Sequence, residues 1–347
     1  MNESRVPFSS NSRKCRAMRA IQQRTRYMTM RDVRMRGSDR DRREMATSIR
    51  NVELPMSATK KDGEDRVRTF PARIDHQRRR CLRIEQAVDR GLEDDKFRLA
   101  YQPIVDGDSR RIVGAEALLR LDDDELGSVS PEEFIPVAEG KGLIADIGCW
   151  VLERACAQVK AWRDSIDPAL SVAVNLSPQQ INAAFPDQVV ALLRNNDLNA
   201  SALELEITES MLLGDCHEVV MVLTALKEMG VNVSTDDFGT GYSSLSYLDR
   251  FPLHGLKIDK SFVSGLPDRR EAAVITCAIV SIAHALGMRV TAEGVETSEQ
   301  ADFLRILGCE RQQGYAYGRP MNPEDFAKAV LYPDRGKGCD AQSDRTE

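Results

Sequence analysis

The chain has 347 residues, 42% of them hydrophobic, and a formal net charge of −6. This length allows one large domain with an appendage, and no run approaches the ~18 apolar residues of a membrane span or resembles a signal peptide. Eight scattered cysteines without a CxxC pair, and only four histidines, argue against zinc or haem sites and predict reduced thiols in the cytoplasm.

The N-terminal part of the chain differs from the rest in charge. Residues 1–90 contain 24 Lys and Arg against 12 Asp and Glu, whereas the remainder contains 24 against 42. Residues 1–57 are rich in Arg, Met and Ser and lack strand or helix periodicity, which predicts a mostly disordered basic extension. An arginine-rich arm can neutralise phosphates, but no aromatic interleaving or known module accompanies it, so nucleic acid is not the expected partner.

A connecting segment and a tail flank the predicted main domain. Residues 58–92 contain a polar turn, Thr59–Phe70, and a predicted amphipathic helix, Ile74–Leu92, whose apolar residues fall at helical spacing. Residues 333–347 are charged and Gly-rich, which predicts a disordered tail. The main domain is therefore expected over residues 93–332.

Strand-like runs alternate with helical stretches through this main domain. The eight strand-like runs are Phe97–Val105, Ile112–Leu121, Leu170–Leu176, Leu203–Thr208, Val231–Thr235, Gly255–Ile258, Arg289–Ala292 and Arg311–Tyr315. The clearest helices are Ile144–Trp162, Asp187–Arg194, Cys216–Met229, Arg270–Leu286 and Ser298–Leu307. Gly230 and Gly287 stand where a helix needs a left-handed terminal residue. The alternation predicts an α/β fold, a (β/α)8 TIM-type barrel of about 250 residues, with a doubly wound open sheet as the alternative.

Polar side chains lie at or near one end of every strand from the second to the eighth. They are Glu116 and Arg120, Asn175, Glu204, Glu206 and Glu209, Asp236 and Asp237, Lys257 and Asp259, Glu293 and Glu296, and Gln313. Each alone has an ordinary interpretation, such as a solvated strand residue or a helix N-cap. A barrel gathers strand ends at one face, where these carboxylates would repel one another unless a cation neutralised them. Oxygen ligands without His or Cys indicate Mg²⁺ or Mn²⁺, and the surplus of acids indicates two ions, an arrangement that hydrolyses phosphodiesters.

Seven motifs carry a family resemblance from about Phe97 to Val330. In chain order they are GAEALLR, VNLS, ELEITES, DDFGTGYSSLSYL, LKIDKSFV, AEGVET and QGYAYGRP, and together they closely resemble the EAL-domain cyclic-di-GMP phosphodiesterases. The resemblance implies a modified (β/α)8 barrel with an antiparallel first strand, and cleavage of cyclic di-GMP to linear pGpG with Mg²⁺ or Mn²⁺. It also implies a homodimer whose interface is linked to metal binding through the turn Phe238–Ser244.

The same resemblance assigns roles to individual residues. It implies metal ligands at Glu116, Asn175, Glu206, Asp236, Asp237 and Glu293; catalytic residues at Lys257, Glu293 and Glu296; substrate-binding residues at Gln102, Arg120 and Gln313; and a structural tether at Glu209. Asp236 would bridge two ions, with a water nucleophile between them that Lys257 orients. Arg120 would hold a phosphate and Gln102 a guanine edge, and Glu209 would tether the turn after the fifth strand.

One segment departs from the family pattern. After EALLR the family usually carries a Trp and a His-Pro pair, whereas residues 121–125 of this chain read LDDDE. We expect a loop here, at the border of the substrate cleft, whose negative charge weakens binding of an anionic dinucleotide.

Two other functions remain open from the sequence. The first is a catalytically silent cyclic-di-GMP receptor; silent members typically lose metal ligands, and here the set is complete. The second is an arginine-rich nucleic-acid-binding protein on a barrel scaffold. In addition, residues 59–92 resemble the end of a GGDEF (diguanylate cyclase) domain and its linker, which suggests a truncated descendant of a GGDEF–EAL protein.

Overall fold

The computed structural model describes residues 72–212, 217–239 and 250–332, with side chains from residue 79 onward. The predicted basic extension, most of the turn Phe238–Ser244 and the predicted tail lie outside these residues. Within the described ranges, no helix combines the length and the apolar character that crossing a membrane requires.

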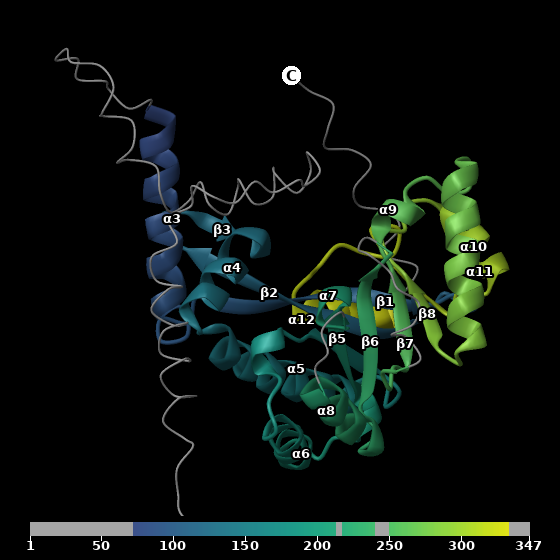
Figure 1. Cartoon of the computed structure of the whole chain (residues 1–347), viewed down its shortest axis with the longest axis horizontal. Helices are drawn as coiled ribbons and strands as arrows, with labels where there is room; N and C mark the ends of the chain where they lie inside the picture. The colour runs from purple at the N-terminus through teal and green to yellow at the C-terminus, as the bar shows by residue number, and fades with distance from the viewer. Residues whose placement is uncertain (1–71, 213–216, 240–249, 333–347) are drawn as a thin grey trace, which may run out of the picture. The chain divides into compact units, whose positions relative to one another are not determined.

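Eight strands close into a barrel (Figure 1). They are β1 (Phe97–Asp106), β2 (Ile112–Asp123), β4 (Ser171–Asn175), β5 (Leu203–Thr208), β6 (Asn232–Phe238), β7 (Gly255–Ile258), β8 (Arg289–Ala292) and β9 (Arg311–Gln313). Their order is β1-β9-β8-β7-β6-β5-β4-β2, and the pairing of β1 with β2 closes the ring. β1 is antiparallel to both neighbours, while the other barrel pairs are parallel. The predicted modified (β/α)8 barrel is confirmed, and the open sheet is excluded.

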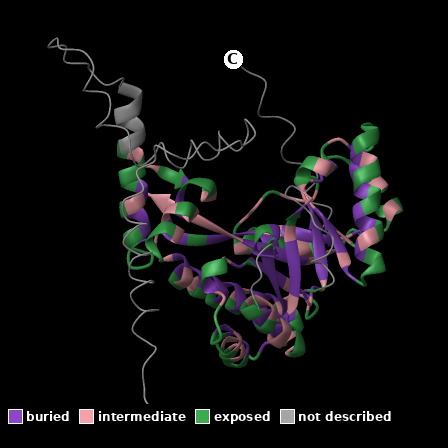
Figure 2. Ribbon diagram, viewed as in Figure 1, coloured by how far each residue is buried: buried purple, intermediate pink, exposed green. Residues whose placement is uncertain are grey.

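Helices cover the outside of the barrel (Figure 2). The longer ones are α3 (Ala72–Arg90), α4 (Pro131–Lys141), α5 (Ile144–Ser165), α6 (Phe185–Asn195), α8 (His217–Glu228), α10 (Arg270–Ala285), α11 (Ser298–Leu307) and α12 (Pro323–Leu331). The short α7 (Glu209–Leu212) and α9 (Lys260–Val263) follow β5 and β7. Gly230 and Gly287 adopt the expected left-handed φ, +86° and +71°. Neither α4, whose pattern Pro136 interrupts, nor α12 was predicted from the sequence.

β1 shows how the barrel wall separates two environments. Phe97 and Tyr101 point outward, where their rings lie 5.9 Å from Phe134 of α4 and 4.8 Å from Trp162 of α5. Because side chains alternate along a strand, the even-numbered residues, including Gln102, face the opposite side of the wall. This alternation places Gln102 and Glu116, which are paired across β1 and β2, on the inner side of the wall.

β1 and β2 extend together as a two-stranded ribbon, to which β3 (Gly127–Val129) adds a short third strand. The prediction that the second strand ends at Leu121 was wrong, and of the predicted loop at residues 121–125 only Asp124 and Glu125 lie in a turn. β2 continues because Asp122 pairs with Ser128 and Asp123 pairs with Gly127 in a tight hairpin. The acidic residues therefore lie partly on a strand, where their directions are fixed by the alternation of the β-ladder.

Candidate active site

A buried lysine lies among the carboxylates at the C-terminal end of the barrel. Lys257, on β7, is 1% exposed. Its Nζ lies 2.6 Å from Oε1 of Glu293, 2.8 Å from Oε2 of Glu206, 3.3 Å from Oδ1 of Asp236 and 3.5 Å from Oε2 of Glu116. One positive charge therefore faces four carboxyl groups that come from β2, β5, β6 and the end of β8. We call these five residues the lysine cluster.

Three amide side chains extend the cluster through Glu116. Asn175 Nδ2 donates to Oε1 of Glu116 at 2.7 Å, and Gln313 Nε2 donates to Oε2 at 2.7 Å. Gln313 Nε2 also lies 3.0 Å from Oε1 of Gln102. Both oxygens of Glu116 are thus held in place, and Oε1 of Gln313 is buried without a partner among the described residues. The structure brings these four predicted site residues into one network.

Two consecutive acids reach the same site because β6 is irregular at its end. The pairing of β6 with β7 shifts register between Thr235 and Phe238, and Asp237 has a left-handed φ of +53°. In a regular strand neighbouring side chains point to opposite faces, whereas a bulge re-aims one of them. Oxygen atoms of Asp236, Asp237 and Glu293 consequently lie within 4.8 Å of one another. The backbone distortion therefore assembles a set of ligand atoms that strand alternation alone would have separated.

Burial determines the protonation of the lysine cluster. Burial raises the pKa of Glu206 well above its ordinary value and raises the pKa of Glu293 to about 7. Burial opposes the charge on Lys257, but the surrounding carboxylates raise its pKa well above its ordinary value. Burial also acts against the charge on Glu116, yet Lys257 and the hydrogen bonds from Gln313 and Asn175 lower its pKa. A single lysine thus does not balance the four acids, and the raised pKa values of Glu206 and Glu293 favour proton binding at these two members of the cluster.

The donor set fits hard divalent cations. Carboxylate and amide oxygens are the ligands that Mg²⁺ and Mn²⁺ prefer, and the donors of this site include neither His nor Cys. The close oxygen atoms of Asp236, Asp237 and Glu293 are joined through Asp236 and Glu293 to the rest of the lysine cluster. A divalent ion bound here would replace the protons that the acids otherwise hold.

Two predicted site residues lie outside the lysine cluster. Arg120 is half-buried, its Nη1 donates to the carbonyl of Leu119 at 2.9 Å, and no carboxylate of the described residues lies within ion-pair distance of it. Glu296 is exposed, and none of the described residues hydrogen-bonds its carboxylate. The side chains of Arg120 and Glu296 therefore do not take part in the network of buried acids.

Glu209 and Glu204 have structural contacts at opposite ends of β5. Glu209, 4% exposed, accepts a hydrogen bond at 3.1 Å from the backbone N–H of Gly239, next to the end of β6. Glu204 lies on the same face as Glu206, but it pairs with Arg311 at 2.9 Å near the other end of the barrel. Glu204 thus neutralises an arginine and is not part of the lysine cluster.

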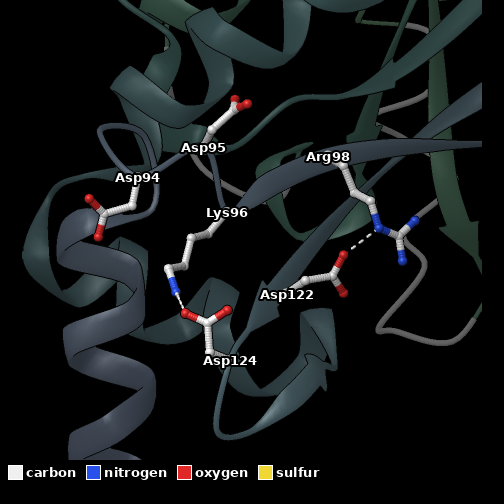
Figure 3. A pocket seen from close by; sticks show the side chains of 6 residues that line it. All are labelled: Asp94, Asp95, Lys96, Arg98, Asp122 and Asp124. Carbon is white, nitrogen blue, oxygen red and sulfur yellow. Dashed lines mark hydrogen bonds and ion pairs between the residues drawn. The ribbon is translucent and has the colours of Figure 1, made fainter.

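Basic partners accompany the acids of the hairpin between β2 and β3 (Figure 3). Asp122 pairs with Arg98, Asp123 and Asp124 lie 3.8 Å and 2.7 Å from Nζ of Lys96, and Glu125 pairs with Arg83 of α3. We call residues 122–125 the acidic hairpin. A cavity of about 530 Å³ lies here, lined by Asp94, Asp95, Lys96, Arg98, Asp122 and Asp124. These ion pairs offset much of the negative charge of the acidic hairpin. Two of the basic partners, Arg98 and Lys96, were not among the site residues predicted from the sequence.

Comparisons with known proteins show which family the chain is similar to. The family model of the EAL domain matches residues 85–320. The chain is 37% identical over 287 residues to the signaling protein YkoW of Bacillus subtilis, covering 82% of this chain and 35% of YkoW. It is 39% identical over 281 residues to the bifunctional diguanylate cyclase/cyclic di-GMP phosphodiesterase MucR of Pseudomonas aeruginosa, covering 81% of this chain and 41% of MucR. The chain thus spans well under half the length of both relatives.

Solved structures are similar as well. The PaMucR phosphodiesterase in complex with c-di-GMP superposes with a TM-score of 0.67 at 42% identity, covering 70% of this chain and 99% of that chain. The cAMP-bound form of the EAL enzyme Bd1971 gives a TM-score of 0.69 at 30% identity, covering 77% of this chain and 76% of that one.

Proposed function

The chain belongs to the EAL domain family, and from this premise we propose that it is a metal-dependent phosphodiesterase that hydrolyses cyclic di-GMP to linear pGpG. The observation that carries the proposal is the lysine cluster, with the oxygen atoms of Asp236, Asp237 and Glu293 within 4.8 Å of one another. The substrate is supported by the name of MucR and by the c-di-GMP complex of PaMucR.

The six predicted ligands would hold two ions, Mg²⁺ or Mn²⁺. Ions at these positions would supply the positive charge that lowers the pKa of an attacking water and stabilises negative charge on the phosphoryl oxygens. Lys257, relieved of its carboxylate partners, would donate a hydrogen bond that orients this water. The water adds to phosphorus as the bond to the 3′ oxygen breaks, which leaves a 5′-phosphate and a 3′-hydroxyl.

The remaining predicted residues would position the substrate and the metal ligands. Gln102 and Gln313 are hydrogen-bonded to one another beside Glu116. A guanine edge could replace Gln313 as the hydrogen-bond partner of Gln102. Arg120 and Glu296 would meet the parts of the dinucleotide that extend beyond the metals. Glu209 would couple the end of β6 to the following turn, and through it to a homodimer interface, in a cytoplasmic enzyme.

A hydrolysis assay tests this function. The full chain is incubated with cyclic di-GMP and Mg²⁺ or Mn²⁺, and pGpG is followed by chromatography. We expect product from the wild type, at least about a thousandfold less from Glu116→Ala, and none with a chelator. Glu133→Ala is the matched control, because Glu133 lies on α4 and pairs with Arg80 at the surface. Tight binding of cyclic di-GMP without product would instead identify a silent receptor.

A further inference from the structure

We propose that Arg98 is a second substrate-binding arginine. It binds the phosphodiester of cyclic di-GMP that is not hydrolysed, and this phosphodiester displaces Asp122 from the guanidinium of Arg98. This inference rests on the proposed function. It also assigns a role to the acidic hairpin, the segment in which this chain departs from the family pattern.

The β-ladder places Arg98 on the face of the ribbon that also carries Gln102 and Glu116. Gln102 is paired with Glu116, and four residues further along the ribbon Arg98 is paired with Arg120. Residues directly opposite in an antiparallel pair share a face, and so do residues two and four apart on one strand. Arg98 therefore lies on the same face as the predicted guanine and metal contacts, about 13 Å of strand from Glu116.

Two arginines directly opposite each other create a site for an anion. Like charges at paired positions destabilise a ladder unless a negative group lies between or beside them. Burial and the neighbouring Arg98 lower the pKa of Arg120, and they outweigh the opposing effects of Glu116 and Asp122. Asp122 pairs with Arg98 only, while Arg120 has no carboxylate within ion-pair distance among the described residues. An anion that both guanidinium groups share would satisfy Arg120 as well, which Asp122 does not.

The Arg98–Asp122 pair is weak enough to be displaced. The two side chains are 53% and 43% exposed, and ion pairs of this exposure change an equilibrium by roughly fivefold at most. A phosphodiester bound by two guanidinium groups forms several charge-assisted hydrogen bonds, for which the planar arginine fork is suited. The cavity beside the pair provides room for the Asp122 side chain to move away from Arg98 (Figure 3).

The test is a double-mutant cycle on binding and turnover in the full chain. The dissociation constant of cyclic di-GMP is measured by calorimetry with a chelator present, so that no hydrolysis occurs, and kcat and KM are measured with Mn²⁺. Arg98→Ala should weaken binding about tenfold and raise KM with kcat nearly unchanged. Asp122→Asn should strengthen binding about threefold because it releases Arg98. In the Arg98→Ala background, Asp122→Asn should have no further effect.

The chain offers a closely matched control pair. Arg110 and Asp302 form an ion pair of similar exposure, 44% and 52%, near the opposite end of the barrel, so Arg110→Ala and Asp302→Asn should change neither constant. If Asp122→Asn strengthens binding equally with and without Arg98, Asp122 only repels the substrate and the proposal is wrong. If Arg98→Ala binds like the active wild type, the proposal fails while the proposed function stands. A wild type that neither binds nor hydrolyses cyclic di-GMP overturns both.

Discussion

The lysine cluster and the acidic hairpin both place four acidic residues against basic ones, yet they differ in burial and in charge balance. The hairpin has three basic partners for four acids, and the side chain of Asp124 is 94% exposed. The lysine cluster has one basic residue for four acids, and the side chain of Lys257 is 2% exposed. Water screens most of the first group, in which only Lys96 and Asp123 are largely covered (18% and 15% exposed), whereas the second favours binding of protons or cations. Density of acids alone therefore does not identify a candidate metal site; burial and charge imbalance distinguish the lysine cluster from the hairpin.

Replacing the lysine of each group should give the largest contrast. Lys257→Met removes the buried cation and leaves four carboxyl groups without compensation, so the unfolding free energy of the metal-free protein should fall by about 3–5 kcal/mol near pH 8. Lys96→Met removes a lysine that also contacts two acids, but Asp124 is 94% exposed and Asp123 keeps hydrogen bonds from the backbone N–H groups of Glu125 and Leu126, so we expect a much smaller effect. Denaturant titration of both variants measures the difference. Equal losses would show that burial does not separate the two groups.

The pH dependence of stability should distinguish the two groups next. Folding raises the pKa of Glu293 from 4.5 to about 7, so the folded state binds more protons than the unfolded chain between these values. Stability of the metal-free protein should therefore fall as pH rises from about 4.5 through 7, by up to a few kcal/mol. Saturating Mn²⁺ should reverse this slope, because metal binding displaces protons and strengthens as pH rises. Thermal midpoints at pH 5 to 8, with chelator or Mn²⁺, measure both slopes.

A variant of Glu293 serves as the control for this pH series. Glu293→Gln removes the titrating group, so the metal-free slope should become shallower and the response to Mn²⁺ should weaken. A slope that persists unchanged would assign the titration to another buried acid.

The tether between β5 and β6 should have an intermediate effect. Glu209→Ala leaves the N–H of Gly239 without this acceptor and should cost about 1–3 kcal/mol of stability. Because Gly239 follows the bulge that aims Asp237, Mn²⁺ affinity should fall as well. Thermal unfolding and metal titration measure the two losses. Glu218→Ala, an exposed position in the first turn of α8, is a control that should change neither.

The sequence predicted the barrel and the lysine cluster well because both follow from strand position. Glu206 and Lys257 lie near the C-terminal ends of their strands, and Glu116 lies where the parallel pairing of β2 with β4 ends; such ends converge in a parallel barrel. The joint aim of Asp236 and Asp237 was not predictable in detail, because it depends on a bulge and a left-handed φ. Pattern alone indicated that the strand ends there, and β6 in fact continues through Phe238.

The acidic hairpin was predicted less well because its basic partners are distant from it in sequence and belong to no recognisable motif. Arg83 lies on a helix far from Glu125, and nothing in the local sequence indicates that they meet. Arg98 carried a signal that was available, since it lies four residues before Gln102 and so on the same strand face. The register that pairs Arg98 with Arg120 required the structure.

The smallest expected effect belongs to Asp124, and it provides the final contrast between the two groups. Asp124→Asn should move the thermal midpoint by less than about 2 °C, because the side chain is almost fully exposed and Lys96 keeps Asp123 nearby. Asp236→Asn should instead raise the midpoint of the metal-free protein, since one fewer carboxylate then competes for Lys257, while it abolishes stabilisation by Mn²⁺. Opposite responses to metal from two single Asp→Asn changes would separate a metal-binding group of acids from a solvated one. A midpoint of Asp236→Asn below that of wild type in chelator would show that Lys257 needs all four acids.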